Sequence, residues 1–155
     1  MEEIPSFWNI DTSSLDSVVS PKSVLQKQAS ELSKLSKGKL LGVVRTQQNR
    51  QRDGFIQEFY IEVPLLDNYR YNLLDVIHSI TMFPATIRLY SPAGGQDDTE
   101  TDDLSGFMEA LKRILTSKDT NNLLAGLLAQ VDYEVPTHSG VPSEDAFPPE
   151  EDLPF

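Results

Sequence analysis

Apolar residues recur at helical spacing in the first part of the chain and predict a helix over residues 21–37. Charged and polar side chains fill the positions between them, which is the pattern of an amphipathic helix. Ser20 can cap its first turn, Pro21 suits the first helical position, and Gly38 can end it. The apolar positions are Leu25, Ala29, Leu32 and Leu35.

The hydrophobic period changes to two after residue 39, which indicates strands. Residues 40–46 are rich in leucine and valine, and residues 55–63 alternate between two faces. The polar stretch 47–54 ends in Asp53-Gly54, a turn dipeptide, so we expect a hairpin with a long tip. The face of the second strand that carries most of its apolar residues holds Phe55, Gln57, Phe59, Ile61 and Val63.

Two further segments complete the predicted sheet. Residues 69–80 fit either a helix or a strand, and we favour a strand because tyrosine, valine and isoleucine are frequent and turn residues stand on both sides. Residues 85–90 predict a fourth strand, which the Gly- and Pro-containing stretch 91–95 ends.

The last third of the chain begins with helical patterns. The acidic run 97–103 is expected to form a solvated loop and to cap a helix, whose apolar residues continue at helical spacing to Leu115. Asp119 or Thr120 can cap a second, short helix. The sequence therefore predicts an α+β fold with an N-terminal helix, a four-stranded, mainly antiparallel sheet and two C-terminal helices.

This pattern divides the chain into an arm over residues 1–19, one α+β domain over 20–131 and a tail over 132–155. The arm has one apolar cluster, Phe7-Trp8-Asn9-Ile10, which we expect to pack on the domain's own core. The tail holds seven acids, five prolines and no Lys or Arg. It buries too little apolar surface to order itself, so we expect it to be disordered.

Composition narrows the class of protein. A chain of 155 residues can bury one core without covalent staples, and the absence of cysteine excludes disulfides and thiolate metal sites. No apolar run approaches the ~20 residues of a membrane span, and the start Met1-Glu2-Glu3 lacks the basic region of an export signal. We expect a soluble cytoplasmic protein with no membrane contact, cofactor or metal.

The charge is distributed unevenly along the chain. Residues 1–95 hold ten acids and ten bases, whereas residues 96–155 hold fourteen acids and three bases and so carry the whole net charge of −11. Such a net charge would by itself argue against nucleic acid as a partner, because phosphate binding needs clustered cations. Because residues 1–95 are neutral, this argument is much weaker for that part of the chain.

The sequence offers little for catalysis, and we expect a protein that is not an enzyme. His78 and His138 are the only near-neutral bases; His138 lies in the tail, and His78 lies in an apolar strand, where a structural role is commoner. No nucleophile elbow, phosphate-binding loop or zinc motif is present. The run 97–103 also lacks the ligand spacing of a calcium-binding loop.

The hairpin tip has side chains that can contact nucleic acid. Arg45, Arg50 and Arg52 stand among glutamines and an asparagine; these residue types contact phosphates and bases. Three tyrosines, Tyr60, Tyr69 and Tyr71, offer stacking faces if they lie on the exposed side of the sheet. This predicts weak binding of single-stranded nucleic acid, and a merely solvated loop is the alternative.

The final residues have the clearest functional signal. Acids run directly into an apolar tripeptide, in the order Glu150, Glu151, Asp152, Leu153, Pro154, Phe155. This segment resembles the tail tip of bacterial single-stranded-DNA-binding proteins, although the body lacks that family's motifs. The resemblance implies that Phe155 enters an apolar pocket on a replication or repair protein while its carboxylate meets Arg or Lys. Leu153 and Pro154 would pack alongside, and the acids would steer toward a basic rim.

These observations favour a bacterial or phage adaptor that docks onto DNA-maintenance machinery through residues 150–155. A solubilising tail is the simple alternative, and the sequence leaves the oligomeric state open. A different class is an acidic immunity protein, antitoxin or nucleic-acid-mimicking inhibitor. That class requires an ordered, acid-lined face that includes Asp97, Asp98, Asp102 and Asp103. The body also resembles uncharacterised bacterial proteins that share Pro21-Lys22-Ser23 and the segment 67–71.

Overall fold

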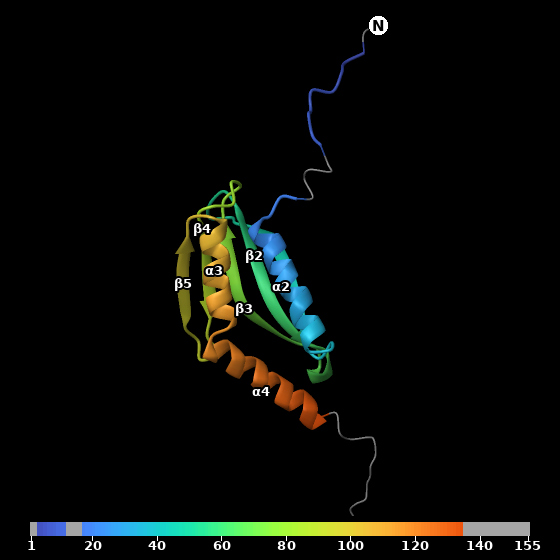
Figure 1. Ribbon diagram of the computed structural model, residues 1–155, viewed down its shortest axis with the longest axis vertical. Helices are drawn as coiled ribbons and strands as arrows, with labels where there is room; N and C mark the ends of the chain where they lie inside the picture. The colour runs from blue at the N-terminus through green and yellow to red at the C-terminus, as the bar shows by residue number, and fades with distance from the viewer. Residues whose placement is uncertain (1–2, 12–16, 135–155) are drawn as a thin grey trace, which may run out of the picture.

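The computed structural model describes residues 3–11 and 17–134. It is an α+β structure in which one antiparallel sheet is covered on one face by helices (Figure 1). The N-terminal helix lies over the first strands, a second helix lies over the last strands, and a third crosses the end of the sheet. The elements in chain order are α2 (Pro21–Leu35), β1 (Leu41–Gln48), β2 (Phe55–Val63), the short 3-10 helix η1 (Pro64–Leu66), β3 (Tyr69–His78), β4 (Ala85–Tyr90), β5 (Gln96–Thr101), α3 (Leu104–Leu115) and α4 (Lys118–Glu134).

The sheet has five strands in the order β1-β2-β3-β4-β5, and each strand pairs antiparallel with the next. The expected strands are confirmed, including residues 69–80, which form β3 rather than a helix. The prediction of four strands was wrong by one, because β5 lies in the acidic segment expected to be a loop. Thr101 is buried and its hydroxyl donates to the Ala85 carbonyl at 2.8 Å, which anchors this edge strand to β4.

The core lies between the helices and one face of the sheet. The predicted alternation in β2 is confirmed: Phe59, Ile61 and Val63 are at most 2% exposed, whereas the residues between them are half-buried on the open face. Phe55, at the end of that strand, is exposed instead. The largest fully buried apolar side chains come from every layer and include Leu25, Leu40, Ile61, Leu74, Ile87, Phe107 and Leu111.

The helix boundaries follow from local capping. The Ser20 hydroxyl accepts from the Ser23 amide at 3.1 Å, and the Ser23 hydroxyl accepts from the Ser20 amide at 2.8 Å, so the predicted cap is a reciprocal pair. The helix ends at Leu35, two residues before the predicted end, because Lys37 and Gly38 have positive φ angles. Asp103 caps α3 as expected, with its carboxylate accepting from the Gly106 amide at 2.8 Å.

The last helix differs from its prediction in cap and in length. Ser117 caps α4, in place of Asp119 or Thr120, because its hydroxyl accepts from the Thr120 amide at 3.2 Å. The helix is 17 residues long and continues to Glu134, so the predicted start of the tail at residue 132 was wrong by three residues. The rest of the predicted tail, residues 135–155, lies outside the described residues. No helix in the described ranges combines the length and apolar character that a membrane span requires.

Helix α2 packs unusually close to β1 at Gly42. A Cβ atom at Gly42 would lie 2.4 Å from the Cα of Ala29 and 2.8 Å from its carbonyl oxygen. The Ser33 hydroxyl accepts from the Gly42 amide at 3.3 Å. This hydrogen bond also links α2 to β1 at the point of close contact. A glycine is therefore required for this helix to seat on the sheet.

The N-terminal arm does not pack on the core, which contradicts the expectation from its aromatic cluster. Phe7 is 85% exposed and Trp8 is 82% exposed. In Figure 1 the described residues 3–11 lie away from the sheet and helices.

Candidate functional site

A row of charged residues crosses the open face of the sheet and forms the candidate site. The strand registers place one charged residue of each strand directly opposite the next. Directly opposite residues of antiparallel strands point to the same face, so the row shares one surface with the open-face residues of β2. Its members, from β1 to β5, are Arg45, Glu58, Asp75, Arg88 and Asp98.

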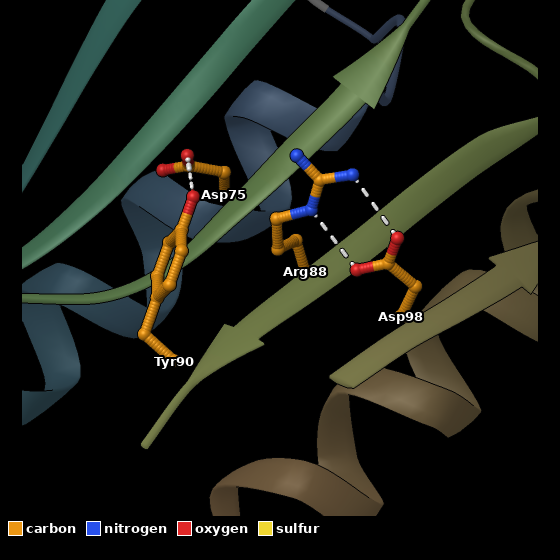
Figure 2. A network of polar contacts seen from close by, with 4 residues as sticks. All are labelled: Asp75, Arg88, Tyr90 and Asp98. Carbon is orange, nitrogen blue, oxygen red and sulfur yellow. Dashed lines mark hydrogen bonds and ion pairs between the residues drawn. The ribbon is translucent and has the colours of Figure 1, made fainter. Parts of the chain in front are cut away.

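Asp75 is the buried centre of this row. It is only 8% exposed, and the Tyr90 hydroxyl donates to its carboxylate at 2.7 Å (Figure 2). The side-chain amide of Asn72 donates to its other oxygen at 3.2 Å. Burial, together with this hydrogen bond to Asp75, raises the pKa of Tyr90 to about 12. Tyr90 therefore remains a protonated donor at neutral pH and fixes the carboxylate in place.

Arg88 and Asp98 form a two-pronged ion pair at the far end of the row. The guanidinium donates to both carboxylate oxygens, at 3.0 and 3.1 Å (Figure 2). This pairing raises the pKa of Arg88 and lowers the pKa of Asp98. Both side chains remain partly open to solvent, at 33% and 42% exposure. The positive charge of Arg88 is thus already matched within the sheet.

A second ion pair covers the aromatic surface on the same face. Arg70 donates to one carboxylate oxygen of Glu62 at 2.6 and 3.1 Å. Its guanidinium carbon lies 5.2 Å from the ring centre of Tyr60, which is within cation–π range. The ring face of Tyr60 is therefore occupied by the protein's own arginine.

The predicted tyrosine platform is not assembled. Tyr60 lies on the open face as required, but Tyr71 pairs with Ile61 and Tyr69 pairs with Val63, which puts both on the helix side. A β-bulge between Phe59 and Tyr60 causes this, because the register shift moves the following β3 residues to the opposite face. The Tyr71 hydroxyl donates to the Tyr90 carbonyl at 2.9 Å.

The three predicted arginines are exposed, as a nucleic-acid contact would require, but they do not form one patch. Arg45 lies on the open face of β1 opposite Glu58, whereas Arg50 and Arg52 lie in the hairpin loop. Arg52 lines a surface pocket of about 300 Å³ with Arg88 and Asp98, and Arg45 does not line it. The basic character of the hairpin is therefore divided between a strand and a loop.

His78 has a structural environment, in line with its interpretation from the sequence. It is 9% exposed, and its Nε2 lies 3.1 Å from the side-chain nitrogen of Gln57. Its Nδ1 lies 2.8 Å from the Ser79 carbonyl oxygen, and the Thr46 hydroxyl donates to Gln57 at 2.7 Å. Both ring nitrogens are engaged within the protein. His138, the other histidine, lies outside the described residues.

The acidic run is more ordered than the sequence suggested. Asp97, Asp98 and Glu100 stand on β5 and are exposed, while Asp102 and Asp103 lead directly into α3. Within the described ranges no group of three His, Cys, Asp or Glu side chains could hold a metal ion. The six tail residues predicted to bind a partner, 150–155, lie outside the described residues.

The links among Asp75, Tyr90, Arg88 and Asp98 carry no signal in the sequence. Alternation along one strand identifies Glu58 and Tyr60 as open-face residues, but only the registers of the β3–β4 and β4–β5 pairs bring these four side chains onto one surface.

The raised pKa of Tyr90 predicts a measurable dependence on alkaline pH. An unfolded tyrosine titrates near ~10, so the stability that the raised pKa contributes is present below that pH and is lost as pH rises through about 12. We expect the phenolate absorbance of wild type minus that of Tyr90→Phe to rise with a midpoint near pH 12. A difference titration centred near ~10 would mean that Asp75 does not hold Tyr90.

Comparisons of this chain with protein-family models, curated proteins and solved structures find no match.

Proposed function

We propose that this protein is a non-enzymatic adaptor that docks onto DNA replication or repair machinery through residues 150–155. The observation that carries the proposal is the order of those residues, three acids followed by Leu153-Pro154-Phe155. A proline-containing tip costs little ordering entropy on binding, and acidic flanks speed encounter with a basic pocket rim. Burial of Phe155 with Pro154, added to one charge-assisted contact of the terminal carboxylate worth ~1.5–3 kcal/mol, should give micromolar-class affinity after association costs.

The surroundings of the body residues support a non-catalytic role. The polar side chains of the open face form hydrogen bonds with one another: Arg88 with Asp98, and Tyr90 with Asp75. His78 has partners on both ring nitrogens. These contacts hold the groups in place and use the donors and acceptors that a substrate would need.

The position of α4 suits a docking segment that follows it. Glu134, the end of α4, lies at the opposite end of the molecule from the N-terminal arm (Figure 1). The 21 residues 135–155 come after it in the sequence, and at ~3.3–3.6 Å per residue they can reach about 70 Å. A partner held by residues 150–155 can therefore leave the sheet and its open face accessible.

Capture from a bacterial lysate, with identification of the bound proteins by mass spectrometry, tests the proposal. We expect wild type to retain replication or repair proteins and Phe155→Ala to lose them, because the ring fills the partner's pocket. Phe147→Ala is the matched control, since Phe147 also stands beside proline in the tail, and it should retain the same proteins. Equal retention by wild type and Phe155→Ala would disprove docking through this segment.

A second candidate, an acidic inhibitor that mimics nucleic acid, is favoured by the geometry of β5. The acids of the 97–103 run are exposed and held on a strand and at a helix start, and a mimic needs carboxylates that are fixed in this way. Arg88 neutralises Asp98, and Asp103 caps α3. The remaining acids of the run, Asp97, Glu100 and Asp102, are exposed. Glu100 stands on the open face opposite Thr86, and Asp97 stands on the helix face opposite Leu89. Both faces of this sheet edge are therefore acidic, and the edge is the part that would occupy a basic site.

The same capture experiment separates the two candidates. The variant Asp97→Asn/Glu100→Gln/Asp102→Asn removes three charges from the acidic edge formed by β5 and the residues after it. Loss of partners with this variant, and not with Phe155→Ala, would establish the inhibitor and refute the adaptor. Retention of partners by both variants would refute both functions.

We also propose that the β1–β2 hairpin binds single-stranded nucleic acid weakly through Arg45, Arg50 and Arg52. Each phosphate contact adds about 0.7 to the magnitude of the salt slope for single strands, so three contacts predict a slope near about −2. Anisotropy of a labelled oligonucleotide at low salt should show binding that is lost when all three become glutamine. Arg70→Gln is the control, because Arg70 is already paired with Glu62. Equal affinity of wild type and the triple variant would show that the hairpin takes no part.

A further inference from the structure

The N-terminal arm carries a dense set of exposed apolar side chains. Within seven residues Ile4, Phe7 and Trp8 are each more than 80% exposed, and Ile10 is 59% exposed. Single exposed apolar residues are common on protein surfaces, but a continuous exposed run with two aromatic rings is typical of a segment that binds another surface. The arm therefore needs an apolar partner surface.

The helix layer has an apolar groove of suitable size. Two adjoining pockets, of about 310 and 340 Å³, lie between α2 and α3 and share Gln28, Leu115 and Thr116. The first pocket continues to α4 and reaches down to the sheet, where its floor is Phe59 and Ile61. The groove is thus long enough to pass along the helix pair and deep enough at one end to hold a ring.

Apolar side chains at the rim of this groove are left open to water. Leu35, at the end of α2, is 80% exposed, and Met108, on α3, is 44% exposed. These residues line the groove but are not covered by any described part of the chain. An occupant that lies along the groove would cover both of them.

Charge along the groove matches the arm. Lys112 lines the groove on the α3 side, and Lys27 and Lys34 stand on α2 beside Glu31, which lines it on the other side. The apolar run of the arm lies between Glu3 and Asp11. An arm seated in the groove would place acidic residues at both ends of its apolar run near a predominantly basic rim.

The position of the arm indicates that the groove is filled by the arm of a second copy of the chain. Residues 3–11 lie away from the body, beyond the N-terminal end of α2 (Figure 1). The deeper pocket is lined by Leu32 and Leu35 at the C-terminal end of α2 and by residues of α4. We infer that the arm of one copy, residues 4–10, docks into the groove between α2 and α3 of a second copy, and that the exchange is reciprocal. This assigns the groove as a self-association site.

The area involved is sufficient for a stable dimer. Each of the rings of Phe7 and Trp8 buries about 150–250 Å², and the groove surface beneath them loses a similar area. Two reciprocal contacts therefore bury roughly 1,600 Å² in all, which is a standard size for a specific interface. The inference is independent of residues 150–155 and of the β1–β2 hairpin.

Trp8 is the only tryptophan of the chain and reports directly on this contact. We expect its fluorescence emission to shift to shorter wavelength, and its quenching by iodide to fall, as protein concentration rises. Sedimentation velocity on the same samples should show monomer converting to dimer over the same concentration range. A monomer with solvent-exposed Trp8 at every concentration would overturn the inference, and so would a blue shift that does not depend on concentration, because that means docking within one chain.

Variants on both sides of the contact complete the test. Phe7→Ser on the arm and Met108→Lys at the groove rim should each weaken dimerisation at least tenfold, and both sites are exposed enough to leave the fold intact. Ile80→Ser is the control, since Ile80 is 80% exposed but lies in the β3–β4 loop away from the groove. A dimer that persists unchanged in both Phe7→Ser and Met108→Lys would place the interface elsewhere and contradict the inference.

Discussion

Replacing Phe107 with alanine should lower the free energy of unfolding by about 3–5 kcal/mol, the range observed for large aromatic side chains removed from cores. Phe107 is fully buried where α3 packs on the sheet, and its ring meets Phe83 edge-on at 6.2 Å between ring centres. The substitution therefore loses both the transfer energy of the ring and the contacts that line the cavity left behind. Urea denaturation followed by circular dichroism measures the change.

Glu109 provides the matched control for that experiment. It lies two residues further along the same helix and is exposed, so Glu109→Ala should change the free energy of unfolding by about 0.5 kcal/mol or less. Similar losses for the two variants would mean that α3 does not present Phe107 to the core.

Replacing Gly42 with alanine should destabilise the protein by about 2–3 kcal/mol, because an added methyl group has no space between α2 and β1. The new Cβ would meet the backbone of Ala29 at 2.4 Å, and a backbone cannot rotate aside as a side chain can. Helix α2 must move outward, which also weakens the hydrogen bond from the Gly42 amide to Ser33. The expected result is a lower urea midpoint with an unchanged slope.

Gly126→Ala tests whether the effect at Gly42 is specific to packing. A Cβ atom at Gly126 would meet nothing within 4 Å, and Gly126 lies inside α4. Alanine there should stabilise the protein by about 0.5–1 kcal/mol, since glycine is a poor residue for a helix interior. The two Gly→Ala substitutions should thus move the midpoint in opposite directions, and a shift in the same direction would contradict the close packing at Gly42.

The parts of the fold that were predictable from the sequence have local signals. The Ser20-Pro21 start of α2 depends on neighbouring residues only, and the two faces of β2 follow from strict alternation within one strand. The bounds of β4 likewise follow from the apolar run and the turn residues after it. These features do not depend on which distant segment of the chain packs against them.

Strand β5 could not be predicted from its own residues because its stability comes from its pairing with β4. Its sequence, Gln-Asp-Asp-Thr-Glu-Thr, has few strand-favouring residues. The pairing of Asp98 with Arg88, and the hydrogen bond from Thr101 to Ala85, hold it against β4. An edge strand can carry many charges because one of its sides faces water.

The candidate site was only partly predictable for a similar reason. The exposure of Arg45, Arg50 and Arg52 agrees with the sequence analysis. The buried carboxylate of Asp75 and the placement of Tyr71 depend on the register between β2 and β3 and on its single bulge. Without that bulge Tyr71 would stand opposite Glu62 on the open face, and a one-residue shift of this kind leaves no mark in a single sequence.

The order of the strands has a consequence for how the chain can fold as it is synthesised. Each strand after β1 pairs with the strand before it, and the connections between successive strands have only five or six residues. Each new strand therefore finds its template already present, and each hairpin closes a short loop at low entropic cost. The helix that covers β1 and β2 precedes both of them in the sequence, so a partial core can form before the second half of the protein leaves the ribosome.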